Sequence, residues 1–185
     1  NGVDCPRYQT VCIRNGDVLQ FGRPLQGCRT YLGVGGQWQL PQWLSSASAI
    51  TQNGAQLTPK AIMKKGQILT IVPRTVPISD LRSETVPSFN PSPRVRVVPG
   101  PEFEWFPRFS IGTFFNQSFT ISPDANRMGY RLKEHLETFQ PDTELISSGI
   151  LPGTIQVTNA GQPIILLADA QTSGGYYRLA NVIRR

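Results

Sequence analysis

The sequence predicts a mainly β protein that is built as two linked subdomains. Seventeen glycines and sixteen prolines among 185 residues suit a chain with frequent turns and with prolines at strand edges. Short apolar runs alternate with turn dipeptides at a spacing that is typical of a barrel or a sandwich. Hydrophobic residues make up 39% of the chain and charged residues 16%, which excludes a disordered chain or a coiled coil.

The first half contains the pattern of short strands. Asn15 and Gly16 mark a tight turn, and a second turn is expected at Asn53 and Gly54. The predicted strands of this half are residues 11–13, 18–21, 28–34 and 67–72. A proline-rich, polar stretch follows at residues 73–93 and indicates a linker or an extended edge segment. We therefore expect residues 1–92 to belong to a first subdomain and residues 93–185 to a second.

The second half begins with a strand at residues 94–100 and a helix near residues 102–109. An aromatic and β-branched run at residues 114–121 predicts another strand. The remaining predicted strands are residues 154–157, 164–169 and 177–185. The apolar run at 164–169 is continuous, which indicates burial on both faces. Because the chain ends within a strand that has just begun, we expect it to be a fragment.

Charge and cysteine usage narrow the function classes. The formal charge of +6 comes from scattered basic residues rather than from one stripe, so a nucleic-acid face is not expected. Three cysteines, Cys5, Cys12 and Cys28, do not form a disulfide framework, and small buried hydrophobes in a reducing compartment are the preferred interpretation. No apolar run approaches the roughly 18 residues of a membrane span, and the expected location is the cytoplasm. The single histidine, His135, lies in a polar stretch, so neither a histidine-based catalytic centre nor a metal site is expected.

The richest polar segment is residues 168–176. Asp169, Gln171 and Thr172 follow a buried strand, and Gly174, Gly175 and Tyr176 come next. Polar groups at such a position are costly unless they are paired with each other or with a ligand. Two adjacent glycines let backbone N–H groups approach an anion closely. A catalytic cluster and a polar turn whose aspartate caps its own loop explain this segment equally well.

Two further candidates contain a guanidinium or amides. Arg127, after Asn126, is suited to a substrate carboxylate, but an internal salt bridge to Asp169 or Glu102 fits the same residue. Gln156 and Gln162 lie close to buried strands, where an amide side chain can bind a planar amide or urea or can cap a ladder. These alternatives stay open on residue chemistry alone.

Five segments together resemble one protein family. They are RTYLGVGG at residues 29–36, VRVVPGPE at 95–102, NRMGYRL at 126–132, GTIQV at 153–157 and GQPIILLADAQTSGGY at 161–176. The resemblance is to the biotin-dependent carboxyltransferase and allophanate hydrolase subunit 2 family, which includes the C subunit of 5-oxoprolinase. Asn126, Ala170 and Tyr177 depart from the family's usual residues at their positions. The likeness covers nearly the whole chain, and the last segment is very specific.

The family resemblance implies two cyclophilin-like β-barrels, each present here in part. It also implies an enzyme subunit that acts with a smaller cyclophilin-like partner in ATP-dependent opening of the 5-oxoproline lactam, or in related allophanate hydrolysis or carboxyl transfer to a urea-like amide. Biotin, if used, would be carried by another protein. A non-catalytic protein that antagonises a histidine-kinase inhibitor is the alternative.

Under the enzymatic interpretation the predicted residues take distinct roles. Arg127 holds a carboxylate, the Gly174 and Gly175 amides stabilise an oxyanion, and Asp169 orients Gln171 or Thr172 or moves a proton. Asn126, Gln156, Gln162 and Tyr176 are expected to contact the substrate. The substrate, the ATP-binding residues and the oligomeric state are not determined by the sequence.

Overall fold

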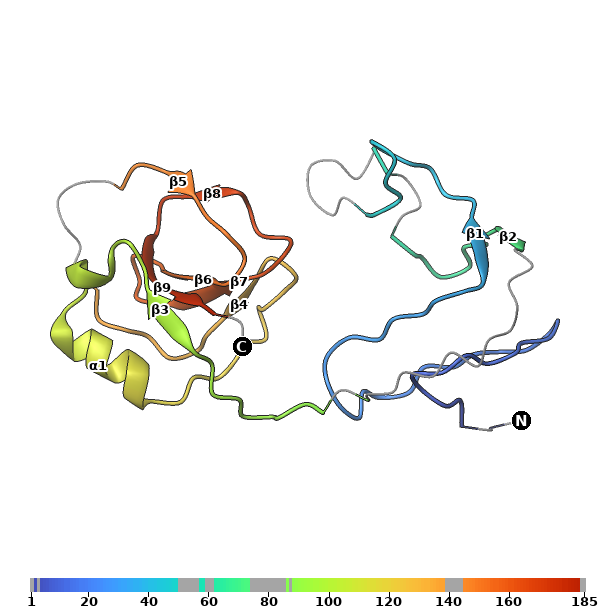
Figure 1. Cartoon of the computed structure of the whole chain (residues 1–185), viewed down its shortest axis with the longest axis horizontal. Coiled ribbons are helices and arrows are strands. Elements are labelled where there is room, and N and C mark those ends of the chain that lie inside the picture. Colours follow the sequence, from blue (N-terminus) through green and yellow to red (C-terminus); the bar gives the residue numbers. More distant parts are fainter. Residues whose placement is uncertain are drawn as a thin grey trace. The chain divides into compact units, whose positions relative to one another are not determined.

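The computed structural model describes residues 2, 4–49, 57–58, 62–73, 86, 88–138 and 145–183. The chain divides into two compact units, Asn1–Pro91 and Ser92–Arg185 (Figure 1). The strands of the described residues pair antiparallel and contain more residues than the helices do, which confirms the prediction of a mainly β fold. The expected turn at residues 53–54 lies outside the described residues.

The first unit contains one small ladder. Strand β1 (Gly36–Trp38) pairs antiparallel with β2 (Ile71–Pro73), with Gly36 opposite Pro73. Gly36 has a φ of 153°, and a Cβ atom there would lie 2.5 Å from Ile71 Cγ2, so a side chain would push the two strands apart. The strand predicted at residues 67–72 is present in part, because β2 begins at Ile71 and ends at Pro73, one residue beyond the predicted range.

The other strands predicted in this unit are wrong. The turn after Arg14 does form, because the Asp17 N–H donates to Arg14 O over 3.1 Å and Gly16 takes a φ of 88°. Residues 11–13, 18–21 and 28–34 nevertheless have no ladder around it. Val18 is 89% exposed, and a β-prone run without a partner that buries its apolar face has little to stabilise it as a strand.

All three cysteines lie in the first unit and are exposed. The prediction that Cys5, Cys12 and Cys28 are buried hydrophobes is therefore wrong. They lie in a part of the chain that forms no apolar core among its described residues. Burial of a small thiol needs a core to receive it.

The second unit is organised around a five-stranded antiparallel sheet in the order β3-β9-β6-β7-β4 (Figure 1). Its strands are β3 (Val97–Pro99), β4 (Gly129–Arg131), β6 (Thr154–Val157), β7 (Pro163–Leu166) and β9 (Tyr177–Val182). A separate ladder joins β5 (Ser148–Gly149) to β8 (Ser173–Gly174). The strands predicted at 94–100, 154–157, 164–169 and 177–185 are confirmed, three of them with shorter bounds. Strand β7 ends at Leu166 because residues 167–170 form a turn, closed by the Ala170 N–H on Leu167 O.

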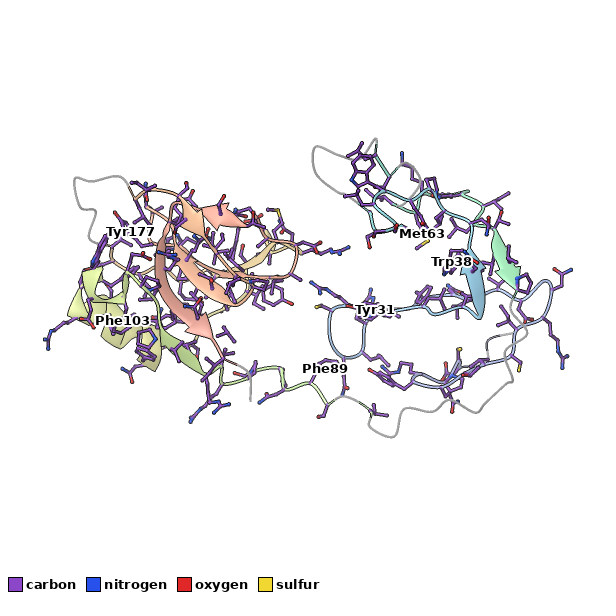
Figure 2. All side chains as sticks on the ribbon, turned by 45° about the horizontal axis from the view of Figure 1, so that its top comes forward. Tyr31, Trp38, Met63, Phe89, Phe103 and Tyr177 are labelled. Carbon is purple, nitrogen blue, oxygen red and sulfur yellow. The ribbon has the colours of Figure 1, made fainter. Side chains whose placement is uncertain are left out.

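The core of this unit lies against its central strands. All four residues of β6 are buried, and Val157, Leu179 and Ala180 have no exposed surface. Burial of each large apolar side chain contributes about 1.5–3 kcal/mol. The full set of buried residues in the main cluster is Phe106, Leu136, Ile155, Val157, Tyr177, Leu179 and Ala180. Figure 2 shows Tyr177 within this unit, next to the helical segment that carries Phe103. The middle of the sheet is thus the most strongly determined part of the fold.

The strand predicted at residues 114–121 does not form: its first three residues belong to a helix, and of the rest only Ile121 makes a β-bridge, with Leu132. The chain forms a 3-10 helix, η1 (Phe103–Trp105), and then α1 (Arg108–Asn116), so the helix expected near 102–109 is split and extended. Pro107 separates the two because it cannot donate a helical hydrogen bond. Ile111 and Phe114 then lie three residues apart on one face, against the core. This helical spacing outweighs the β propensity of the aromatic run.

A close backbone contact fixes the turn between β6 and β7. The Gly161 N–H donates to Thr158 O over 2.8 Å, and Gly161 has a φ of 82°. A Cβ atom on Gly161 would overlap the backbone oxygen of Leu136. Any side chain there must displace the segment that covers the core, so glycine is required.

Substitution of this glycine gives a first test. We expect Gly161→Ala to lower the free energy of unfolding by about 2 kcal/mol or more, through the positive φ and the clash with Leu136. Gly112→Ala is the matched control, because Gly112 lies in α1 and a Cβ atom there meets nothing within 4 Å; it should raise stability by about 0.5–1 kcal/mol. Urea denaturation followed by circular dichroism measures both. Equal stability of the two variants would contradict the proposed role of Gly161.

Candidate active site

The pairing of β4 with β7 brings two predicted site residues together. Gly129 lies opposite Leu166, and the Leu167 N–H donates to Met128 O over 2.9 Å. Because the strands are antiparallel, the loop before β4 and the turn after β7 meet at one edge of the sheet. Arg127 and Asp169 form an ion pair there, with 2.7 Å between Nε and Oδ2.

This ion pair is accessible to solvent. The Arg127 side chain is 65% exposed and that of Asp169 is 35% exposed. An exposed pair contributes roughly 0–1 kcal/mol to stability. A guanidinium carries five N–H donors, so a second carboxylate can bind beside Asp169. The internal salt bridge and the anion site are therefore compatible at Arg127.

Asn126 shapes the loop that presents Arg127. Its Oδ1 accepts a hydrogen bond from the Met128 N–H over 2.8 Å, and its own N–H donates to Gly129 O over 3.1 Å. These bonds close a tight turn in which the side chain supports the backbone. Asn126 thus acts on the position of Arg127, and its carbonyl oxygen performs this task as a carboxylate oxygen would.

Gln171 and Thr172 lie in the exposed loop after Asp169. Neither side chain is hydrogen-bonded to another residue in the described part of the chain. The backbone of this loop is anchored where the Ile150 N–H donates to Thr172 O over 3.0 Å. The structure therefore pairs Asp169 with Arg127 and leaves both neighbouring side chains open to solvent.

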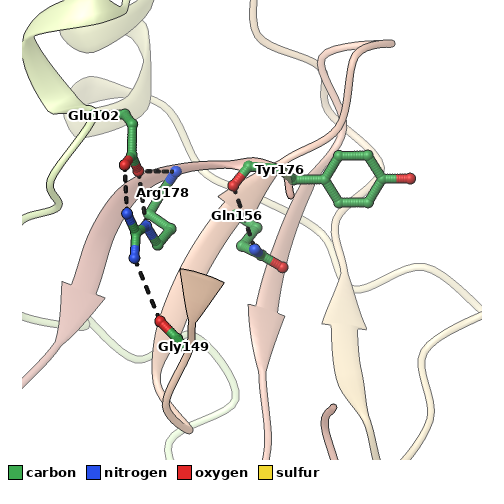
Figure 3. A network of polar contacts seen from close by, with 5 residues as sticks. All are labelled: Glu102, Gly149, Gln156, Tyr176 and Arg178. Carbon is green, nitrogen blue, oxygen red and sulfur yellow. Dashed lines mark hydrogen bonds and ion pairs between the residues drawn. The ribbon is translucent and has the colours of Figure 1, made fainter. Parts of the chain in front are cut away.

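Gln156 lies beneath strand β8. Its side chain is buried, with 1% of the residue exposed, and its Nε2 donates to Tyr176 O over 3.3 Å (Figure 3). Gly174 packs directly on this amide, because a Cβ atom there would lie 2.9 Å from Gln156 Nε2. The Tyr176 ring points away from the amide, and the residue is 42% exposed. Gly175 is exposed and follows the ladder.

Gln162 lies at the other end of strand β7. Its Nε2 donates to Leu132 O over 3.1 Å, and its Oε1 accepts a bond of 3.4 Å from Arg131 Nη1. Because it precedes β7 and Asp169 follows it, the two are separated by the length of the strand, roughly 3.3 Å for each residue. Gln162 caps the turn between β6 and β7 and is not brought to Arg127.

An ion pair that was not predicted lies inside the same unit. Glu102 Oε2 accepts hydrogen bonds from the Arg178 backbone N–H over 3.0 Å and from Arg178 Nε over 2.8 Å, and Oε1 pairs with Nη2. Arg178 Nη1 also donates to Gly149 O over 3.3 Å (Figure 3). The Arg178 and Glu102 side chains are 18% and 6% exposed. Glu102 therefore pairs with Arg178 and not, as one alternative had it, with Arg127.

Burial and hydrogen bonding act in opposite directions on Glu102. Desolvation raises the pKa of its carboxyl group, but the bonds from the Arg178 side chain and backbone and the nearby positive charge together bring the pKa below the usual 4.5. The bond to Glu102 raises the pKa of Arg178. The pair stays charged at neutral pH. The signal that could have revealed it is an arginine between two apolar residues of β9, since a buried charge requires a partner.

The described ranges form neither a metal centre nor a membrane-spanning helix. No group of three or more His, Cys, Asp or Glu side chains is placed there to hold a metal ion. Within the same ranges, the helices are too short or too polar to pass through a bilayer. His135 is exposed.

Comparison with known proteins gives a consistent picture. A family model described as "Carboxyltransferase domain, subdomain A and B" matches residues 1–185. The C subunit of 5-oxoprolinase from Escherichia coli is 36% identical over 92% of this chain and 54% of the relative. The same-named protein of Haemophilus influenzae is 35% identical over 96% and 55%. Urea amidolyase of Saccharomyces cerevisiae is 26% identical over 71% of this chain and 8% of the relative. The chain thus spans about half the length of the two 5-oxoprolinase relatives.

The buried ion pair predicts acid sensitivity. Glu102→Gln should lower the free energy of unfolding at pH 7 by about 3 kcal/mol, because it leaves the Arg178 charge without its partner. The wild-type pair stabilises the fold above pH 4.5 and loses this contribution as the pH falls through the lowered pKa of Glu102. Urea denaturation between pH 7 and pH 3 should therefore show a smaller pH dependence for Glu102→Gln. Glu104→Gln, at an exposed position in η1, should behave as wild type; equal losses in both variants would refute the assignment.

The two adjacent glycines should differ in their tolerance of a side chain. Gly174→Ala should lower the free energy of unfolding by about 1–3 kcal/mol, because its Cβ atom clashes with the Gln156 amide. Gly175→Ala should change it by less than about 0.5 kcal/mol, since the nearest atoms, Leu145 O and Ser147 Oγ, lie 3.4 Å away. Thermal unfolding of both variants measures the difference. A larger loss for Gly175→Ala would show that the packing on Gln156 is not as described.

Proposed function

The chain belongs to the family of the carboxyltransferase domain, subdomains A and B, and from this membership we propose that it forms part of the C subunit of a 5-oxoprolinase. The observation that carries the proposal is the identity of 36% and 35% to two proteins of that name over more than nine tenths of this chain. The exposed Arg127–Asp169 ion pair supports it as a site for a small anionic substrate.

The chemistry of 5-oxoproline suits the residues at this edge of the sheet. The molecule carries a carboxylate beside a cyclic amide, and in the proposed reaction water adds to the amide carbonyl and the C–N bond opens to give glutamate. Arg127 binds the carboxylate through its free N–H donors. Asp169 holds the guanidinium in place and accepts or returns a proton as the ring opens.

A backbone donor lies next to this loop. The Gly175 N–H follows the β8 ladder and donates to no other residue in the described ranges. Such a donor can stabilise the negative charge that develops on the carbonyl oxygen. We assign this role to Gly175, whereas Gly174 packs on Gln156. Gln171 and Thr172 are exposed beside it and are proposed to bind substrate or water.

ATP is proposed as the co-substrate of the complex, and a smaller cyclophilin-like subunit as the partner. The sequence lacks a glycine-rich phosphate loop. No step of the nucleotide chemistry is therefore assigned to this chain. Biotin, were the reaction a carboxyl transfer, would arrive on another protein.

Urea is the second test substrate because a urea amidolyase is among the relatives. Nothing in the relatives' names or in the described residues favours the regulatory alternative, and we do not propose it. Consumption of urea without consumption of 5-oxoproline would move the assignment to the amidolyase branch.

Two substitutions test the proposed site. With the candidate partner subunit and ATP, Arg127→Ala and Asp169→Ala should each reduce kcat/KM for 5-oxoproline by about 100-fold, because each removes charge from the binding site or the transition state. Arg127→Ala should act mainly through KM and Asp169→Ala mainly through kcat. Release of glutamate and phosphate measures both. Arg108→Ala, at an exposed position in α1, is the control; wild-type turnover in both site variants would overturn the proposal.

A further inference from the structure

Ser148 has a buried hydroxyl group without a partner. Its Oγ is the one buried side-chain nitrogen or oxygen atom in the described ranges that makes no hydrogen bond. Buried polar atoms are nearly always paired, because an unpaired one bears its full desolvation penalty. A native fold keeps such a group where a ligand or an ordered water supplies the missing bond. The Ser148 hydroxyl is therefore available to bond to a group from outside the chain.

The strand register shows which way this hydroxyl faces. Ser148 of β5 lies directly opposite Gly174 of β8, and directly opposed residues project from the same face of a ladder. Gly174 faces the Gln156 amide, since its Cβ position lies 2.9 Å from Nε2 and 3.2 Å from Ile150 Cδ1. The Ser148 side chain thus lies on the inner face of the β5–β8 ladder, the face that covers the Gln156 amide.

The Gln156 amide has hydrogen-bonding capacity left. Its NH₂ group carries two hydrogens, and the bond to Tyr176 O uses one of them. A carboxamide presents its carbonyl oxygen and one N–H in one plane. A cyclic amide holds its own C=O and N–H on one edge, so the two groups can form a pair of hydrogen bonds. The second lone pair of the ligand's carbonyl oxygen then remains for a hydroxyl donor.

We propose that Ser148 and Gln156 together bind the amide edge of a cyclic amide, with the Ser148 hydroxyl donating to the ligand's carbonyl oxygen. This inference rests on the proposed function and deepens it, because it names the residues that hold the lactam. Gly174 covers the Gln156 amide in this structure, so binding requires the β5–β8 ladder to move aside. Each strand of this ladder has two residues, so few hydrogen bonds are lost when it opens. The second residue of β5, Gly149, is held by Arg178, whose Nη1 donates to the Gly149 backbone oxygen.

A binding experiment on the 185-residue chain tests this without turnover. The probe is 2-pyrrolidinone, a five-membered lactam without a carboxylate, and the readout is the side-chain NH₂ signal of Gln156 in ¹⁵N-resolved NMR. Titration should shift this signal in wild type, and N-methyl-2-pyrrolidinone, which lacks the N–H donor, should not shift it. Ser148→Ala should weaken binding of 2-pyrrolidinone by about tenfold, the loss expected for one hydrogen bond.

Two controls separate binding from folding. Ser147→Ala alters the exposed neighbouring serine and should bind the probe as wild type does. Without ligand, Ser148→Ala should unfold at the same urea concentration as wild type or a higher one, because it removes an unpaired buried hydroxyl. Equal binding by Ser148→Ala and wild type, or no shift of the Gln156 signal at saturating probe, would overturn the inference. Failure of the complex to hydrolyse 5-oxoproline would overturn the proposed function and leave this binding result unchanged.

Discussion

The antiparallel pairing of β4 with β7 is the constraint on which the candidate site depends. It places the residues before β4 beside those after β7, so Arg127 meets Asp169 although 42 positions separate them in the sequence. A register shift of one residue would turn every side chain of β4 to the opposite face. Gly129 secures the register, because a Cβ atom there would lie 2.9 Å from Ile164 Cγ2. Packing of a glycine thus positions a charge two residues away.

The two ion pairs of this unit serve different purposes because their exposure differs. Glu102 and Arg178 are buried, and three donors of one arginine satisfy one carboxylate, so the pair joins η1 to β9 and costs stability when one partner is removed. Arg127 and Asp169 remain hydrated, and a hydrated pair adds little to stability. The Arg127–Asp169 pair therefore contributes little to folding, which is compatible with its proposed role in binding a ligand.

The sequence predicts the second unit far better than the first. Residues 154–157 and 164–166 are strand-like segments that pair with each other and are mostly buried, so their local pattern and their tertiary partners agree. Residues 11–34 have the same local pattern but no ladder among the described residues to bury it. Residues 114–121 were misassigned because their aromatic content favours a strand while Pro107 and the spacing of Ile111 and Phe114 favour a helix. The family motifs identify Arg127 and Asp169 as candidates, but only the register decides between Asp169 and Glu102 as the partner of Arg127.

Hydrogen-bond satisfaction separates the polar residues in a way that sequence chemistry cannot. Gln156 and Gln162 are the same residue type beside neighbouring strands, yet Gln162 uses both ends of its amide within the fold, whereas Gln156 keeps donor capacity beneath a small ladder. Ser147 and Ser148 are adjacent and identical, but of the two only the Ser148 Oγ is both buried and unpaired. Because desolvation penalises a buried polar group that is left unpaired, a buried group without a partner in the chain is expected to bond to a ligand or to water. This difference supports the proposal that Gln156 and Ser148 bind a ligand, whereas Gln162 uses its amide within the fold.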